Sequence, residues 1–327
     1  MAFTIKCKPL ILFAWLVLLA NINHVAASTI GLPTRDQNPI LQPYYLPTLG
    51  FASQPGWQYS NSLFITNTFQ TESVNNETLV IDAESYRFEF AIAYQQNDWR
   101  LSTKIPLIFN QGGSLDGLIE GWHDFFGLSD GGRKSNPNDQ LNIEYINNGQ
   151  TVFLQDSSTN DIGDIEVALS YRLAGDEKQS TEISAGIELP TGSIETNSGN
   201  EAIDVALWLV HQRSVTEMTE LYGLIAYSRL GTGGQLGGQL NAGTWVAQLG
   251  AEHDFNANIT GILQFDMHSA LIKDSELKAF GNSLQVQVGL KFRNWIENHN
   301  LDLFFSEDIY SGSAPDITFG IRLSSRN

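Results

Sequence analysis

The side chains of this 327-residue sequence that could do chemistry are mostly charged groups at alternate positions of short segments. Alternate residues of a strand point to one face, so these acids and bases gather on one side of a sheet. The acids on that face are Glu89, Glu166, Glu182, Glu188, Asp204, Glu252, Asp266 and Asp302, and the bases are Arg87, Arg100, Lys104, Arg172, Lys291, Arg293 and Arg322. A near-neutral set can line a wide water path, orient an anionic solute, or pair off in a narrow space.

Two histidines stand beside possible catalytic partners. His123 precedes Asp124, and His268 precedes Ser269, a pairing that could suggest an outer-membrane hydrolase. Adjacent residues do not face each other on a helix, and they point to opposite faces of a strand. We therefore expect no catalytic residues and no enzyme activity, with the hydrolase kept as a minor alternative.

The sequence offers little to a metal ion or a cofactor. Asp156, Asp161 and Asp164 supply oxygens of the kind that calcium prefers, but their spacing is not that of an EF-hand loop. The glycines between 231 and 238 lack the GK[ST] of a phosphate-binding loop. We expect no metal and no cofactor, and we leave open a divalent-ion site in the acidic loops.

The first 27 residues have the pattern of a secretory signal peptide. Lys6 and Lys8 precede an apolar run at 10–20, and small residues precede a cut after Ala27. The run is too short to span a bilayer as a helix. Removal would take the net charge from −18 to −20, because two lysines leave, and would remove Cys7, the only cysteine. Such an acidic chain is not expected to bind nucleic acid.

Residues 28–56 form a proline-rich leader that precedes the alternating segments. Prolines 33, 39, 43, 47 and 55 favour an extended chain and exclude a central strand. Tyr44 and Tyr45 could anchor this periplasmic leader at the mouth of a barrel. A disordered leader is the alternative.

From residue 57 to the end, the pattern predicts an all-β transmembrane antiparallel barrel of about twelve strands. Alternation of apolar and polar residues, with aromatics near the strand ends, is typical of outer-membrane barrels. The expected strands are 57–70, 85–94, 99–105, 165–171, 183–189, 203–209, 221–227, 245–251, 259–267, 284–292, 301–305 and 317–323. Short connections should alternate with long outer loops, and residues 142–145 and 151–154 should form an outer hairpin around Asn147-Asn148-Gly149. A soluble β-sandwich is the alternative fold.

One segment, 112–133, departs from this pattern and predicts a helix over 115–126 in a long extracellular loop. On a helical wheel, one side is apolar and Asp124 lies on the other. The expected constriction or lid residues are Leu115, Leu118, Ile119, Trp122, His123, Asp124, Phe125 and Phe126, and the expected hinges are Gly112, Gly113, Gly131 and Gly132. Gly117 and Gly121 suggest close approach to a wall. An ordinary helix in a surface loop is the alternative.

Three stretches carry a resemblance to a known family. GLPTRDQNP (31–39), GGSLDGLIEGWHDFFGLSDGGR (112–133) and DIGDIEVALSYRL (161–173) resemble an uncharacterised family of Gram-negative outer-membrane β-barrels, a domain of unknown function. More distantly, KIPL (104–107), GDIEV (163–167) and ELPTG (188–192) resemble putative phenol-degradation outer-membrane proteins. The resemblance implies the fold and an outer-membrane location, and no established activity.

Two functions are therefore expected from different classes. The first is a narrow or gated channel for a small solute, with the 115–126 helix as its constriction. The second is a closed structural or binding barrel, plugged by that helix, with loops that contact lipopolysaccharide or a partner. Outer-membrane lipid surrounds the protein in both. The sequence is silent on the solute and on the oligomeric state.

Overall fold

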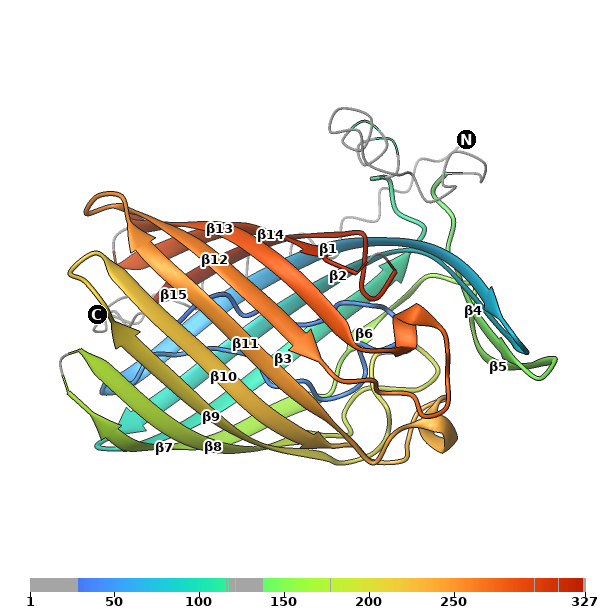
Figure 1. Cartoon of the computed structure of the whole chain (residues 1–327), viewed down its shortest axis with the longest axis horizontal. Helices are drawn as coiled ribbons and strands as arrows, with labels where there is room; N and C mark the ends of the chain where they lie inside the picture. Colours follow the sequence, from blue (N-terminus) through green and yellow to red (C-terminus); the bar gives the residue numbers. More distant parts are fainter. Residues whose placement is uncertain are drawn as a thin grey trace, which may run out of the picture.

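Twelve antiparallel strands close into a barrel in the computed structural model (Figure 1), which describes residues 29–115, 117, 121, 138–176, 178–296, 298–310 and 312–325. Each strand pairs with its neighbour in the ring, and β1 pairs with β15 to close it. The barrel strands are β1 (Gly56–Val74), β2 (Glu77–Gln96), β3 (Trp99–Gln111), β7 (Ile165–Gly175), β8 (Gln179–Leu189), β9 (Asp204–Ser214), β10 (Thr219–Arg229), β11 (Gly243–Asp254), β12 (Ile259–His268), β13 (Ser283–Ile296), β14 (His299–Asp308) and β15 (Ile317–Ser325).

The outer surface of the barrel is apolar, as a membrane requires. Leu101, Leu207 and Leu249 are more than half exposed, and they belong to alternate positions whose neighbours are buried. Aromatic rings pair on this surface near the strand ends: Trp57–Tyr94, Trp99–Tyr171 and Tyr227–Trp245 have centroid separations of 4.9, 4.6 and 5.1 Å. The predicted twelve-strand transmembrane barrel is confirmed, and the β-sandwich is excluded.

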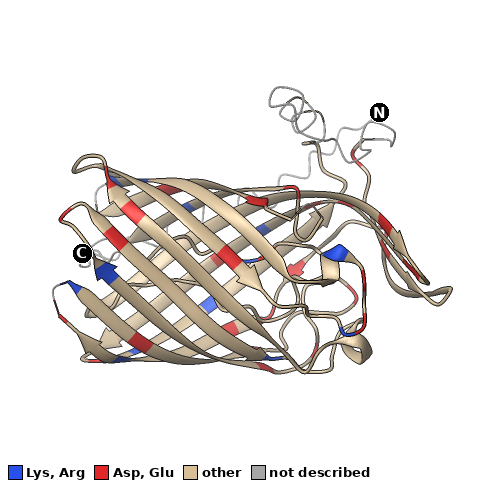
Figure 2. Ribbon diagram, in the orientation of Figure 1, with Lys and Arg blue, Asp and Glu red and all other residues tan. Residues whose placement is uncertain are grey.

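The two ends of the barrel differ in the length of their connections. At one end, here called the short-turn end, the strands are joined by two to four residues, as at 97–98, 176–178 and 215–218. At the other, the long-loop end, the connections include 190–203, 230–242 and 269–282. This alternation agrees with the prediction. Acidic and basic positions occur along the strands as well as in these connections (Figure 2).

A small sheet extends the barrel wall beyond the long-loop end. The outer part of β2 pairs with β4 (Asn142–Asn147), and β4 pairs with β5 (Gln150–Gln155) in the predicted hairpin. Its turn residues Asn148 and Gly149 both have positive φ, the conformation of a type I′ turn. A short strand, β6 (Thr159–Ile162), pairs with the end of β3. The sequence analysis missed the strand character of residues 71–84, because their apolar residues face inward rather than toward lipid.

A hydrophobic cluster, here called the cap core, lies at the long-loop end. Leu79, Ile81, Ile143, Tyr145 and Phe153 of the small sheet pack there with Leu236, Leu271, Leu277 and Phe280 of the long loops. The rings of Tyr145 and Phe280 meet edge to face at 4.9 Å. Two 3-10 turns, η2 (Gly237–Gln239) and η3 (Lys278–Phe280), shape these loops. The cap core holds the long loops over the end of the barrel.

The predicted helix over 115–126 lies outside the described residues, apart from Leu115, Gly117 and Gly121. The two glycines are exposed, and a Cβ on either would meet no atom within 4 Å, so the expected close approach to a wall is wrong at these positions. Gly113 has a φ of +83°, and a Cβ there would collide with Glu84, while its role as a hinge stays a prediction. Residues 1–28, Gly131 and Gly132 also lie outside the described residues. Within the described ranges, no helix is long and apolar enough to cross a membrane.

Phe280→Ala tests the cap core. Removing a buried phenylalanine costs about 3–5 kcal/mol, and here the loss falls on the loops rather than on the strand ladder. We expect loops 230–242 and 269–282 to become sensitive to added protease, while the heat-modifiable gel mobility of the barrel stays unchanged. Phe255→Ala, at a ring that is 61% exposed in a short turn, is the matched control. Equal protease resistance of Phe280→Ala and the wild type would contradict the role of this cluster.

Candidate functional site

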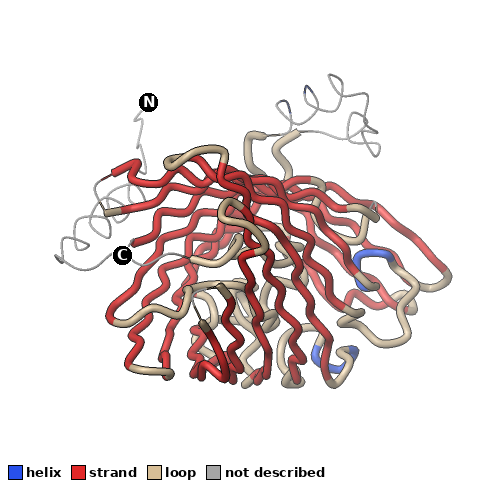
Figure 3. Tube along the Cα trace, turned by 60° about the vertical axis from the view of Figure 1, so that its left-hand side comes forward, coloured by secondary structure: helices blue, strands red, loops and turns tan. Residues whose placement is uncertain are grey.

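Residues 29–55 occupy the lumen of the barrel and are here called the N-terminal plug. Nearly all of residues 29–49 are buried, and their partners are inward side chains on strands around the ring. Tan loop segments lie inside the ring of strands in Figure 3. The expected leader, disordered or held only at the mouth, is therefore corrected: a proline-rich chain cannot join the sheet, but it satisfies the inward polar groups of the wall.

The plug is a hairpin whose two ends lie together at the short-turn end. A bridge joins Thr29 to Phe51, and the N–H of Ile30 donates to the carbonyl of Gly50 at 2.9 Å. Near the tip, Arg35 Nη2 donates to the Gln42 carbonyl at 2.8 Å and ties the two arms together. The chain therefore enters the lumen, turns at residues 38–44 and returns.

The ascending arm follows β12 with the two-residue period of the strand. Gln264 Oε1 accepts the N–H of Leu32 at 2.9 Å, and Asp266 accepts the hydroxyl of Thr34. His268 Nε2 lies 2.9 Å from Asp36 Oδ2. An extended chain and a strand advance by the same distance per residue, so contacts recur at every second position of each.

Gly31 is required at the base of this arm. Its φ is +54°, a region where residues with side chains are disfavoured. A Cβ there would lie 2.7 Å from Gln264 Oε1 and from the ring of Tyr222. Only glycine fits this position without displacing the plug.

The descending arm contacts strands on several sides of the lumen, namely β9, β11 and β3. Asp204 accepts the N–H of Tyr45 at 3.1 Å, and Gln248 Oε1 accepts that of Leu49 at 2.8 Å. Lys104 Nζ donates to Thr48 Oγ1 at 2.5 Å. Gly186 on β8 leaves room for Tyr45, because a Cβ there would lie 2.3 Å from the phenol oxygen. The two arms together bridge the ring from β12 to β3 and β9.

The fifteen predicted lumen residues all lie on the inner side of the barrel, where most are buried and form ion pairs. Glu166 is the centre of one set: it lies 3.2 Å from Arg35 of the plug, 3.7 Å from Arg87 and 3.6 Å from Lys104. Other ion pairs on the inner side are Arg87–Glu89, Arg100–Glu182, Arg172–Asp98, Lys291–Glu252, Arg293–Asp254 and Arg322–Asp302. The narrow-lumen alternative, in which opposite charges pair, describes this arrangement.

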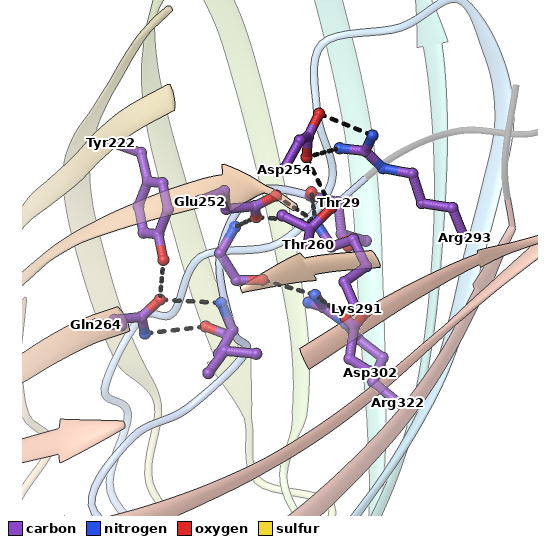
Figure 4. A network of polar contacts seen from close by, with 12 residues as sticks. Thr29, Tyr222, Glu252, Asp254, Thr260, Gln264, Lys291, Arg293, Asp302 and Arg322 are labelled. Atoms are coloured by element: carbon purple, nitrogen blue, oxygen red, sulfur yellow. Dashed lines mark hydrogen bonds and ion pairs between the residues drawn. The ribbon is translucent and has the colours of Figure 1, made fainter. Parts of the chain in front are cut away.

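At the short-turn end, these pairs also hold the base of the plug (Figure 4). Lys291 Nζ lies 2.7 Å from Glu252 and donates to the Thr29 carbonyl at 3.3 Å, while Glu252 accepts the N–H of Gly31 at 2.9 Å. Arg322, paired with Asp302, donates to the Gly31 carbonyl at 2.6 Å.

Within the described residues, the buried carboxyl group of Glu188 has an oxygen without a hydrogen-bond partner. Glu188 on β8 is 2% exposed, and its Oε2 accepts no hydrogen bond among the described residues. Asp164, in the bend before β7, accepts the N–H groups of Gly192 and Asn200 at 2.7 and 3.0 Å. Burial raises the pKa of Asp164 above its usual value, although these two donors act to lower it. The wall near the plug tip therefore carries more acid than the pairs neutralise.

Some of the positions weighed for catalysis and metal binding have other partners in the structure. The Ser269 hydroxyl bonds with Thr244 and with the N–H of Trp245, not with His268. Asp161 accepts the hydroxyl of Thr196. His123 and Asp124 lie outside the described residues. Among those the structure describes, no three His, Asp or Glu side chains are grouped so that they could hold a metal ion.

Little space remains around the plug. Between the arms and the wall lies a cavity of about 60 Å³, lined by Tyr45, Arg100, Glu182 and Trp208 among others. At about 15 Å³ per water, this holds roughly four waters. A wider polar vestibule of about 410 Å³ lies below the plug, lined by Arg172, Glu220, Lys291 and Arg293.

These features define a class: a transmembrane β-barrel of the outer-membrane type whose lumen is filled by its own N-terminal segment. The chain belongs to the family described as "Protein of unknown function (DUF3187)", whose model matches residues 9–326. The fold therefore indicates that the protein lies in an outer membrane.

Several solved structures are similar to this chain at low sequence identity, and one of them reaches a TM-score above 0.5. The COG4313 outer membrane channel from Pseudomonas putida F1 is 11% identical, with a TM-score of 0.57 over 84% of this chain and 96% of that one. The NanC porin is 7% identical, with a TM-score of 0.44 over 83% and 99%. The Ralstonia pickettii toluene transporter TbuX is 12% identical, with a TM-score of 0.41 over 84% and 90%. No curated protein matches the chain in sequence.

The plug residues are the part of the site that the sequence analysis missed. Prolines drew the interpretation toward disorder. The same stretch also holds Leu32, Ile40, Leu41, Leu46 and Leu49, which are all buried. Disordered segments contain few large apolar residues. The apolar composition of residues 29–49 could therefore have predicted that this segment is buried.

Arg322→Ala tests the ion pairs at the base of the plug. It leaves Asp302 buried without its cation and removes the donor to Gly31, and breaking a buried pair in this way costs about 3–5 kcal/mol. We expect a lower urea midpoint for folding in detergent or lipid. Arg229→Ala, at an exposed arginine on the outer surface, is the control and should change stability by about 0.5 kcal/mol or less. An unchanged midpoint for Arg322→Ala would contradict the importance of this pair.

Proposed function

We propose that this protein is a gated channel for a small solute in the outer membrane of a Gram-negative bacterium, and that the N-terminal plug is its gate. The observation that carries the proposal is the nature of the lumen. Most of the inward side chains of its wall are polar or charged, apart from apolar residues such as Phe64, Ile262 and Phe304 that pack against the plug, yet the space is filled by a segment that forms no part of the sheet. A polar wall can line a water-filled channel, and a plug that is not part of the sheet can leave the lumen and so act as a gate.

The plug could leave the lumen without any part of the chain being pulled through the barrel. Both ends of the hairpin lie at the short-turn end, and its contacts with the wall are made by side chains rather than by a strand ladder. The hairpin can therefore withdraw toward the periplasm while the barrel keeps every backbone hydrogen bond. Several buried hydrogen bonds would be lost, so the closed state is favoured at rest.

Two further features support this reading. The plug tip contacts the long loop 190–203, where Asn197 donates to the Pro39 carbonyl at 2.8 Å. An event at the long-loop end can thus reach the gate. The Pseudomonas putida protein with the same fold is named an outer membrane channel.

A closed structural or binding barrel is the second candidate. The cap core and the paired lumen charges favour it, because both stabilise a filled barrel. In that case the long loops contact lipopolysaccharide or a partner, and the protein conducts nothing. Neither candidate includes a catalytic role.

Conductance in a planar bilayer separates the candidates. Gly31→Val should raise the open probability by tenfold or more, because the new side chain collides with Tyr222 and Gln264 and loosens the plug. Gly50→Ala is the matched control, since a Cβ there meets nothing within 4 Å. Adding Thr34→Cys and Asp266→Cys to Gly31→Val should close the channel when oxidised and reopen it on reduction, because these short side chains touch each other.

The folded state of each variant is checked by heat-modifiable gel mobility. Current in Gly31→Val that does not respond to oxidation of the cysteine pair would refute the plug as the gate. No current in any folded variant would favour the closed barrel.

We retain the helix expected over 115–126 as a second constriction at the long-loop end. Glu84 Oε2 accepts the N–H groups of Ser114 and Leu115 at 3.0 and 2.9 Å and so anchors the start of this segment to β2. Deleting 115–126 from the Gly31→Val variant should raise its single-channel conductance. Unchanged conductance would remove this segment from the gate.

A further inference from the structure

An open groove lies on the lipid-facing surface over β9, β10 and β11, with a volume of about 430 Å³. Gly223 on β10 points outward and leaves a gap between larger neighbours, because it pairs with His211 on one side and Leu249 on the other. Side chains of Leu209, Leu221, Ile225 and Leu249 line this gap. The groove is apolar along most of its length.

Two nitrogen-bearing side chains line the same groove nearer the short-turn end. His211 and Arg213 are both exposed and occupy successive outward positions of β9. Thr181 Oγ1 lies 2.9 Å from His211 Nδ1 and holds the ring in place. When the hydroxyl donates to Nδ1, Nε2 carries the hydrogen and can donate outward.

Arg213 differs from the arginines of the lumen. Arg87, Arg100 and Arg322 each face a carboxylate, whereas the guanidinium group of Arg213 has no ion pair or hydrogen bond within the described part of the chain. Its neighbours on the outer surface include Leu221 and the exposed Val215. An unpaired cation in an apolar, lipid-facing surface is stabilised when an anion from the bilayer lies next to it. The position is notable because the protein as a whole carries a net charge of −18.

We propose that this groove binds one anionic glycerophospholipid of the periplasmic leaflet. An acyl chain lies over Gly223, and the phosphate meets Arg213 and His211. A guanidinium offers paired donors that match phosphate oxygens, and short turns mark the periplasmic end of such barrels. The apolar length and the basic end together fit a lipid better than a wholly apolar solute, which would have no use for Arg213. This site is independent of the gate.

Native mass spectrometry of the full-length folded protein, titrated with phosphatidylglycerol in detergent, tests the proposal. The wild type should retain one phosphatidylglycerol and prefer it to phosphatidylethanolamine. Arg213→Ala should weaken this retention at least tenfold, and Ile225→Trp, which fills the groove, should do the same without a change of charge. Arg229→Ala on β10 and Ile321→Trp on β15 are the matched controls, because both positions are exposed and lie outside the groove.

Equal retention by Arg213→Ala and Arg229→Ala would overturn the proposal, as would equal binding of the two lipids by the wild type. An effect of Ile225→Trp on solute flux, with phosphatidylglycerol retention unchanged, would also overturn it and assign the groove to an apolar solute.

Discussion

The ion-pair set around Glu166 is the contact on which the filled barrel depends. Without the plug, the wall at this level carries Arg87 and Lys104 beside Glu89 and Glu166, with the buried carboxyl group of Glu188 on β8. Arg35 of the plug adds a third cation next to Glu166. Buried charges are costly unless paired, so Arg35 both fills the lumen and stabilises a buried carboxylate of its wall. Withdrawal of the plug would have to be accompanied by water or a solute that meets the exposed carboxylates.

Two kinds of contact hold the plug: polar contacts in its middle and at its base, and apolar contacts at its tip. In the middle and at the base, its backbone bonds to inward side chains such as Gln264, Gln248 and Glu252. At the tip, Ile40, Leu41 and Tyr44 join the cap core. The plug is therefore tied to the wall by polar contacts and to the long loops by apolar ones. A rearrangement of the long loops would alter the contacts of the plug tip, while Lys291 and Arg322 would continue to bind its base.

Side chains along each barrel strand alternate between the lipid-facing and the lumen-facing side of the wall. Its outer face carries leucines and aromatic pairs, and its inner face carries the charges. The exceptions to this division are informative. Phe64, Ile262 and Phe304 point inward and receive Leu32 of the plug, and Arg213 points outward. Inward apolar residues thus mark where the plug packs, and an outward cation marks a place where the bilayer must supply a partner.

The sequence by itself determined the barrel: the two-residue period, the twelve strands, the contrast between short and long connections, and the inward position of the charged residues. These follow from alternation along a single strand, which is a local property. The tertiary structure decided which charges pair, because Arg100 on β3 and Glu182 on β8 meet across the intervening β7, and this depends on strand order and register. It also decided that β4 extends β2, and that the leader fills the lumen. Those outcomes depend on the space inside the closed ring and on polar groups that need partners there, and neither exists until the barrel has formed.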